Sequence, residues 1–145
     1  MVTKRQRLEA VRSLARLSRL LERASGELSL AHYRVLAAVA DGDERASRVA
    51  TRLALGKPTI SAAVDALCKR GLLSRDTVAG DQRAAALRVT ALGEAMLADV
   101  DTAMVERLDA VLRHVDDPGA LLSALEKVGP ALDRLYDERL AGAAR

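Results

Sequence analysis

A helical hydrophobic pattern broken once by a tight turn is the feature that most limits how this chain can fold. Apolar residues at helical spacing predict a short helix over Ala46–Ala54 and a second one over Lys57–Arg70, joined by a turn at Leu55-Gly56. Pro58 lies in the first turn of the second helix, where its missing amide costs nothing, and Gly71 is a natural left-handed terminator. Two short helices around a tight turn are typical of a helix-turn-helix.

The pattern after Gly71 changes from helical to extended. Leu72–Arg75 is short and apolar, Asp76–Gln82 is a polar, turn-rich loop, and Arg83–Val89 continues as a strand. This predicts a β-hairpin, although three consecutive alanines at 84–86 have weak strand propensity. The fold class expected is therefore mainly α with a small β-hairpin wing, a winged helix-turn-helix.

Amphipathic helices are expected on both sides of this unit. One helix ends at Gly26 and a second covers Leu30–Ala40; Thr90 is placed to cap a long helix that reaches about Val115. Asp116-Asp117-Pro118 breaks the chain and caps a last helix, in which Gly129-Pro130 should produce a kink. The chain is interpreted as one domain over residues 1–145, with terminal helices at 1–25 and 116–145, the winged unit at 30–90 and a linking helix at 91–115.

Charge is distributed unevenly along the chain. Residues 44–90 hold nine Lys and Arg against four Asp and Glu, a net charge of +5, whereas residues 91–145 hold six against eleven, a net charge of −5. A basic block beside an acidic one suggests a module that binds a polyanion, although chance surface charge explains it too. The chain has two Tyr and no Phe or Trp, so it lacks the aromatic platforms on which single strands stack. Duplex nucleic acid is therefore the polyanion expected.

Other functional classes find little support in the residues. No apolar run approaches the roughly 20 residues that span a bilayer, and the first residues lack the apolar core of a signal peptide, so a cytoplasmic protein without a membrane partner is expected. The single Cys68 excludes an internal disulfide framework. His32 and His114 lie far apart with no ligand cluster, so no metal is expected. The sequence has no catalytic motif and no phosphate-binding glycine loop, so we expect that the protein is not an enzyme and binds no cofactor.

The second helix of the predicted pair has the side chains that a DNA-reading helix needs. Small polar or cationic residues near its N-terminus suit a major groove about 12 Å wide. Lys57, Thr59, Ser61 and Ala62 meet this requirement, and Arg83 at the hairpin tip is long enough to enter the adjacent minor groove.

Four stretches carry a resemblance to a known family: LSLAHYRVL (Leu28–Leu36), SRVATRLAL (Ser47–Leu55), KPTISAAVDALCKRGLLSR (Lys57–Arg75) and DQRAAALRVTALG (Asp81–Gly93). In these the chain resembles the multiple-antibiotic-resistance regulator (MarR) family over essentially its whole length. The last stretch is the most specific, because an Asp-x-Arg wing is followed seven residues later by Thr and then by Gly.

The resemblance implies roles for individual residues. Lys57, Thr59, Ser61 and Ala62 fall where family members contact bases and phosphates. Arg83 matches a wing arginine that enters the minor groove, and Asp81 matches an acid that orients it.

Three positions in the predicted helix 57–70 and the turn before it can also be compared with the family pattern. Asp65 matches an acid expected to pair with a basic group. Gly56 stands where members often have a capping Ser, and Ala62 stands where many have a long polar side chain, so the operator sequence is harder to infer.

The resemblance also implies a homodimer in which the terminal helices of two chains interlock. This would set the recognition helices about 34 Å apart, one turn of duplex, to read an inverted repeat. The apolar stripes of the terminal helices supply the expected interface: Leu8, Val11, Leu14, Leu125, Leu132 and Leu135.

The function expected is a homodimeric repressor, with release by a small organic molecule as a further implication of the family. Tyr33 lies where relatives line a ligand cleft, but ordinary packing explains it as well. Two alternatives stay open: a helical interaction module that no longer binds DNA, and a redox-sensing regulator that uses Cys68.

Overall fold

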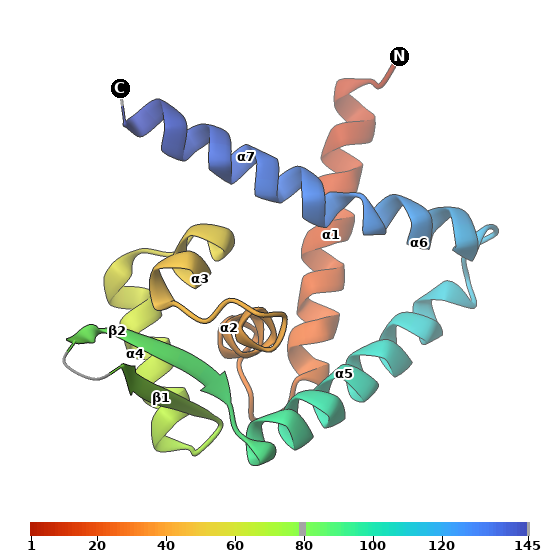
Figure 1. The fold of residues 1–145 in the computed structure, drawn as a ribbon. Coiled ribbons are helices and arrows are strands. Elements are labelled where there is room, and N and C mark those ends of the chain that lie inside the picture. The colour runs from red at the N-terminus through yellow and green to blue at the C-terminus, as the bar shows by residue number, and fades with distance from the viewer. Residues whose placement is uncertain (79–80, 145) are drawn as a thin grey trace.

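The computed structural model describes the backbone of residues 1–78 and 81–144 and the side chains of residues 1–76 and 86–144. Figure 1 shows a winged unit with long helices leading away from it. The elements in chain order are α1 (Lys4–Ala24), α2 (Leu30–Ala40), α3 (Ala46–Leu53), α4 (Lys57–Lys69), β1 (Leu73–Val78), β2 (Asp81–Val89), α5 (Ala91–Leu112), α6 (Pro118–Glu126) and α7 (Val128–Ala143). The predicted fold class, mainly α with a β-hairpin wing, is confirmed.

The hydrophobic core lies inside the winged unit. α2, α3, α4 and the hairpin each contribute to it, and α5 adds two side chains, Val100 and Met104. The largest side chains that are fully buried are Leu28, Val35, Leu36, Val49, Val64, Leu67 and Leu72. The winged unit therefore has a core of its own.

The hairpin is longer than predicted. The prediction of a loop over Asp76–Gln82 was wrong, because residues at both ends of this range belong to the strands. β1 continues through Asp76 to Val78, antiparallel to β2, with Leu73 opposite Val89 and Asp76 opposite Ala86. The Asp76 carboxylate pairs with the Arg88 guanidinium of the facing strand. This cross-strand ion pair and the ladder keep a turn-forming residue extended.

The last predicted helix is two helices, and the kink expected at Gly129-Pro130 is instead a break at Lys127. Pro130 has no amide hydrogen for the carbonyl of Glu126, and its ring would collide with that carbonyl in a continuous helix. The chain therefore ends α6 at Glu126 and places Pro130 in the first turn of α7. The predicted cap at the start of α6 is confirmed, because the Asp117 Oδ1 accepts the Ala120 amide at 2.9 Å.

Thr90 and Gly93 form the junction between the wing and α5. The Thr90 hydroxyl accepts the Gly93 amide at 3.0 Å, which confirms the predicted cap, and donates to the Gly71 carbonyl at 2.5 Å. A Cβ on Gly93 would lie 2.1 Å from the Leu72 carbonyl oxygen. Only glycine lets α5 approach the hairpin this closely.

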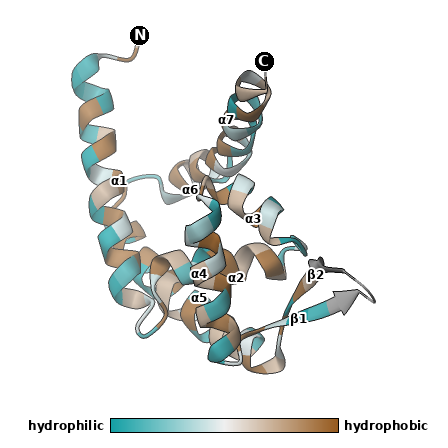
Figure 2. Cartoon of the chain, turned by 90° about the vertical axis from the view of Figure 1, so that its left-hand side faces the viewer, coloured by the Kyte–Doolittle hydropathy of each residue, from teal (hydrophilic) through white to brown (hydrophobic). Residues whose placement is uncertain are grey.

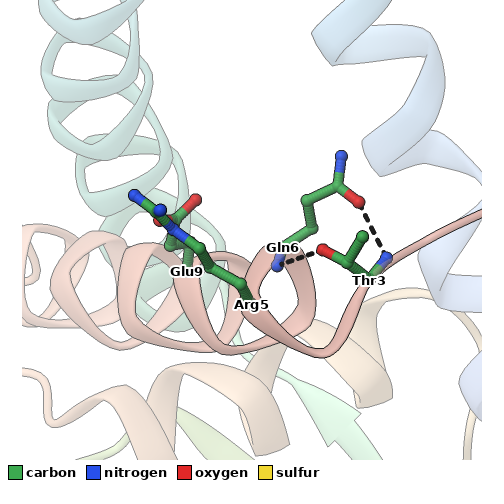
Figure 3. Close-up of polar contacts among 4 residues, drawn as sticks. All are labelled: Thr3, Arg5, Gln6 and Glu9. Carbon is green, nitrogen blue, oxygen red and sulfur yellow. Dashed lines mark hydrogen bonds and ion pairs between the residues drawn. The ribbon is translucent and has the colours of Figure 1, made fainter.

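α1 is well capped but largely uncovered. Figure 3 shows the reciprocal capping box at its start: the Thr3 hydroxyl accepts the Gln6 amide at 3.1 Å, and Gln6 Oε1 accepts the Thr3 amide at 2.8 Å. Arg5 and Glu9 add an ion pair of 3.0 Å on the next turn. Even so, α1 has no buried residue, and residues 1–16 are all exposed.

The C-terminal helices are similarly uncovered. Neither α6 nor α7 contains a buried residue. Both views show α7 passing beside α3, and Figure 2 shows hydrophobic segments recurring along the part of α1 that stands away from the winged unit. Among the described residues, no helix combines the length and the apolar character needed to cross a membrane.

Candidate nucleic-acid interface

α4 divides into a buried face and an exposed face. Ile60, Ala63, Val64 and Leu67 are at most 6% exposed and fix the helix on the core. The residues predicted to contact DNA lie on the other side and are all exposed: Lys57, Thr59, Ser61 and Ala62. The structure therefore gathers these four predicted residues on one accessible surface, held by a rigid core.

The start of α4 leaves hydrogen-bond donors available. Gly56 is the N-cap residue and provides no side-chain cap, and Pro58 lies in the first turn. The Ile60 amide bonds to the Gly56 carbonyl at 3.0 Å. The amides at the start of the helix, with the positive end of its dipole, can therefore hold a phosphate.

Two features outside the core fix the orientation of α4: a left-handed residue before it and an ion pair to the wing. Ala54 adopts a left-handed conformation with φ +53°, which ends α3 and turns the chain toward α4. Asp65 on α4 pairs with Arg75 on β1, which confirms the partner expected for this acid. Hydrogen bonding to Asp65 raises the pKa of Arg75 above its ordinary value. α4 and the wing are thus joined by an ion pair.

The base of the wing is anchored to the core. Leu87 on β2 is 3% exposed, and its amide bonds to the Glu44 carbonyl at 2.6 Å. The backbone of Asp81 is paired with that of Val78 near the tip. The side chains of Asp81 and Arg83 lie outside those that the structure describes, so their roles remain predictions.

Tyr33 connects the winged unit to α5. Its hydroxyl donates to Asp101 Oδ1 at 2.6 Å, a contact between residues 68 positions apart. Burial, together with this hydrogen bond, raises the pKa of Tyr33 to about 12. Tyr33 lines none of the three cavities near α3 and the start of α4, and its role in ligand binding stays a prediction.

Three cavities surround α3 and the start of α4. One of about 460 Å³ lies between α2 and α4, against Ala31, Pro58 and Ala62. The others, of about 340 and 420 Å³, lie between α3 and α7. The cavities between α3 and α7 could not be predicted from the sequence, because their walls come from segments roughly 80 residues apart.

Most of the residues predicted for dimerisation are left exposed by the single chain. Leu8, Val11 and Leu14 on α1 are 46%, 62% and 55% exposed, and Leu132 and Leu135 on α7 are each 41% exposed. Leu125 on α6 is half-buried. Five of the six are thus apolar side chains in water, on helices with no buried residue.

Cys68 is half-buried on α4 and packs against the hydrophobic core. Its surroundings are those of a small apolar side chain. Among the described residues no group of three or more His, Cys, Asp or Glu could hold a metal ion.

The comparisons with known proteins agree with this geometry. A family model described as the MarR family matches residues 27–84, which span α2, α3, α4 and most of the hairpin. A comparison with curated protein sequences gave no match.

Solved structures of similar fold cover nearly the whole chain. The transcriptional repressor CouR, bound to a 23-mer DNA duplex, is 27% identical, with a TM-score of 0.72 over 87% of this chain and 92% of that one. Wild-type MarR from E. coli in its apo form is 16% identical, with a TM-score of 0.71 over 88% and 98%. The transcriptional regulator BldR from Sulfolobus solfataricus is 22% identical, with a TM-score of 0.69 over 88% and 97%.

Proposed function

We propose that this chain, which belongs to the MarR family of transcription regulators, is a homodimeric repressor that reads inverted-repeat duplex DNA. The family consists of transcription regulators and not of enzymes. One copy of α4 from each protomer would enter the major groove, with the wing arginine, Arg83, in the minor groove beside it. Such a protein acts in the compartment that holds the chromosome, so a cytoplasmic location is part of the proposal.

The observation that carries the proposal is the exposed face of α4. Its side chains are small or cationic, its first turn has free amides, and its opposite face is buried in the core. A helix fixed in this way presents donors to a groove with little loss of backbone freedom on binding. CouR, which is described as a repressor, has this fold while bound to a duplex, and the same output is proposed here.

The dimer is supported by the uncovered apolar residues of the terminal helices. A helix of 21 residues with no buried side chain is marginal in water unless its apolar face is covered. Covering α1 and α7 with the same helices of a second copy gives an isologous interface and a two-fold axis. That symmetry is what an inverted-repeat operator requires.

Release by a small organic molecule completes the proposal. A ligand can shift the population of dimers only if it binds one arrangement of the two recognition helices better than the other. Ligand binding would favour a spacing of the α4 helices that no longer matches successive major grooves.

Selection of bound duplexes from a random pool tests the function directly. We expect an inverted repeat with half-sites about 10 base pairs apart. The affinity for that site should fall steeply with salt, with a slope of about −0.9 per phosphate neutralised. A double variant, Thr59→Asp with Ser61→Asp, should abolish binding, because carboxylates would face phosphates and base edges.

Arg134→Gln provides the matched control, since it changes an exposed side chain on α7 and should leave binding unchanged. Recovery of no common site, or an affinity that does not vary with salt, would contradict the proposal. That result would favour the alternative of a helical interaction module.

A further inference from the structure

A cavity of about 460 Å³, here called the α2–α4 hollow, lies where α2 and α4 pack side by side (Figure 2). Thr59 and Ala62 line it from α4. Ala31 and His32 line it from the first turn of α2. Because Ala31, Thr59 and Ala62 are exposed, the hollow opens at the surface. It therefore continues the exposed face of α4 that the proposed function brings to DNA.

The exposed face of α4 has two edges that differ in chemistry. Lys57 and Ser61, one helical turn apart, share the edge that does not line the hollow. Thr59 and Ala62, also one turn apart, share the edge toward α2. The first edge presents an ammonium and a hydroxyl, which suit a phosphate, whereas each side chain of the second edge presents a methyl group. The edge beside the hollow is thus the one that suits a base.

The walls of the hollow are mainly apolar. Most of its lining side chains have no polar atom: Ala31, Leu55, Pro58, Ala62 and Ala63. His32 and Thr59 supply the polar side-chain atoms. Among the described residues, no carboxylate, ammonium or guanidinium lines the hollow. An apolar group of the DNA fits these walls better than a phosphate does, because a buried charge needs a partner.

The C5-methyl group of thymine is the apolar group that B-DNA presents in its major groove, and the O4 acceptor lies beside it on the same base. Thr59 has a hydroxyl that can donate to O4, and its methyl group can contact the C5-methyl. The small side chain of Ala62 leaves the hollow open, whereas a longer one would lie across it. The hollow and its rim therefore match the two features by which thymine differs from cytosine in this groove.

We propose that the α2–α4 hollow is a thymine-reading site, used once in each operator half-site. The C5-methyl group enters the hollow against Ala31 and Ala62, and the Thr59 hydroxyl donates to O4. This inference deepens the proposed function and rests on it, because α4 has to lie in the major groove. Uracil lacks only the C5-methyl group, so it separates the two contacts.

Fluorescence anisotropy with the full chain and a set of uracil-containing duplexes tests the site. Each thymine of the selected duplex is replaced in turn by deoxyuridine, which keeps the base pair and O4. Burial of one methyl group changes an equilibrium constant about fourfold. We therefore expect deoxyuridine at one position per half-site to weaken binding about fourfold, and about 15-fold when both half-sites contain it.

Ala31→Leu separates the hollow from the rest of the interface. It fills the hollow from α2, so this variant should bind the thymine and deoxyuridine duplexes equally. Ala40→Leu is the matched control, because it makes the same change on α2 at an exposed position that does not line the hollow. The control should keep the preference for thymine. Circular dichroism of both variants establishes that they are folded.

Thr59→Val tests the contact with O4 by itself. It removes the hydroxyl and keeps the shape of the side chain. Loss of one hydrogen bond should weaken binding about fivefold. The thymine and deoxyuridine duplexes should be weakened by the same factor, since both contain O4. A loss confined to the thymine duplex would contradict the role given to the hydroxyl.

Three results would each overturn the inference while the proposed function stands, because the protein still binds its duplex in all of them. They are a selected half-site without thymine, a duplex in which no deoxyuridine weakens binding, and a thymine preference that Ala31→Leu retains. If the protein binds no duplex at all, the proposed function itself fails, and the inference fails with it.

Discussion

The winged unit and the terminal helices differ in how much of their apolar surface is buried. The large side chains that are fully buried all lie between Leu28 and Leu72. α1, α6 and α7 contain no buried residue, and they expose leucines and valines along their length. The winged unit is thus complete within one chain, whereas the terminal helices leave apolar side chains exposed, and we infer that another surface covers them.

Simple energetics allow a second copy to be that surface. Burying one Leu or Val side chain stabilises by about 1.5–3 kcal/mol. Association costs roughly 4–15 kcal/mol in lost freedom. Several such residues from each protomer are therefore enough to hold a dimer, and the difference between the two regions becomes a way to test it.

The largest effect is expected from the double variant Leu132→Glu with Leu135→Glu. Two carboxylates in a desolvated interface should raise the dimer dissociation constant at least about a thousandfold, or roughly 4 kcal/mol. Sedimentation velocity should show monomers, and circular dichroism should show that the winged unit remains folded. Arg134→Glu, which adds negative charge to the same helix, should sediment like the unaltered protein. Unchanged sedimentation of the double variant would place the interface elsewhere.

Two matched leucine truncations test whether the winged unit and the terminal helices differ in this way. Leu67→Ala removes a fully buried side chain of the core and should cost about 3 kcal/mol of unfolding free energy, whatever the protein concentration. Leu8→Ala should cost less, and its effect should change with protein concentration because it acts through the dimer. Urea unfolding at two protein concentrations separates the two cases. The same concentration dependence for both variants would remove the distinction between the regions.

Gly93→Ala tests the junction between the two regions. A Cβ would lie 2.1 Å from a backbone oxygen that cannot move away cheaply, so about 2–3 kcal/mol of stability should be lost. Gly129→Ala in α7 is the control, because a Cβ there meets nothing within 4 Å and should be neutral or slightly stabilising. Thermal unfolding compares them, and equal midpoints would contradict the close approach of α5 to Leu72.

Arg83→Ala is expected to affect DNA binding alone. Loss of a wing contact should weaken operator affinity by about 1–3 kcal/mol, while the dimer and its unfolding free energy stay unchanged. A gel shift against the selected duplex measures the change. Affinity equal to that of the unaltered protein would remove the wing from the mechanism.

The smallest effect is expected from Tyr33→Phe, which removes the hydrogen bond to Asp101. The loss should be about 1 kcal/mol at neutral pH, because the phenol is only partly buried. The pKa of Tyr33 is raised to about 12 from an ordinary value near 10, chiefly by burial. Its contribution is therefore complete below pH 10 and is lost as the pH rises through 12. Urea unfolding should show the gap between the two proteins narrowing over that interval; a constant gap would argue against it.

Local signals made much of the fold predictable from sequence. Pro58 and Gly71 bracket α4, and Thr90 marks the start of α5, because these residues act on their own backbone. The exposed face of α4 followed from the same periodicity that gave its buried stripe. Asp76 was wrongly predicted to lie in a loop, because its turn propensity is overridden by pairing across the hairpin with Arg88.

Contacts between distant segments were not predictable from local pattern. No regular spacing in the sequence predicts the hydrogen bond between Tyr33 and Asp101. Tyr136 lines the cavity beside Lys57 only because α7 crosses α3. The break at Lys127 was predictable only in part. Pro130 indicated an interruption of the helix, but the position of the break follows from the clash between the Pro130 ring and the carbonyl four residues earlier.

The stoichiometry of the protein–DNA complex decides whether the chain reads an inverted repeat as a homodimer. Light scattering after size-exclusion chromatography gives the mass of the complex formed with the selected inverted-repeat duplex. Two chains per duplex are expected, each with its α4 in one half-site. One chain per duplex, or a protein that stays dimeric without ever joining the duplex, would contradict the account.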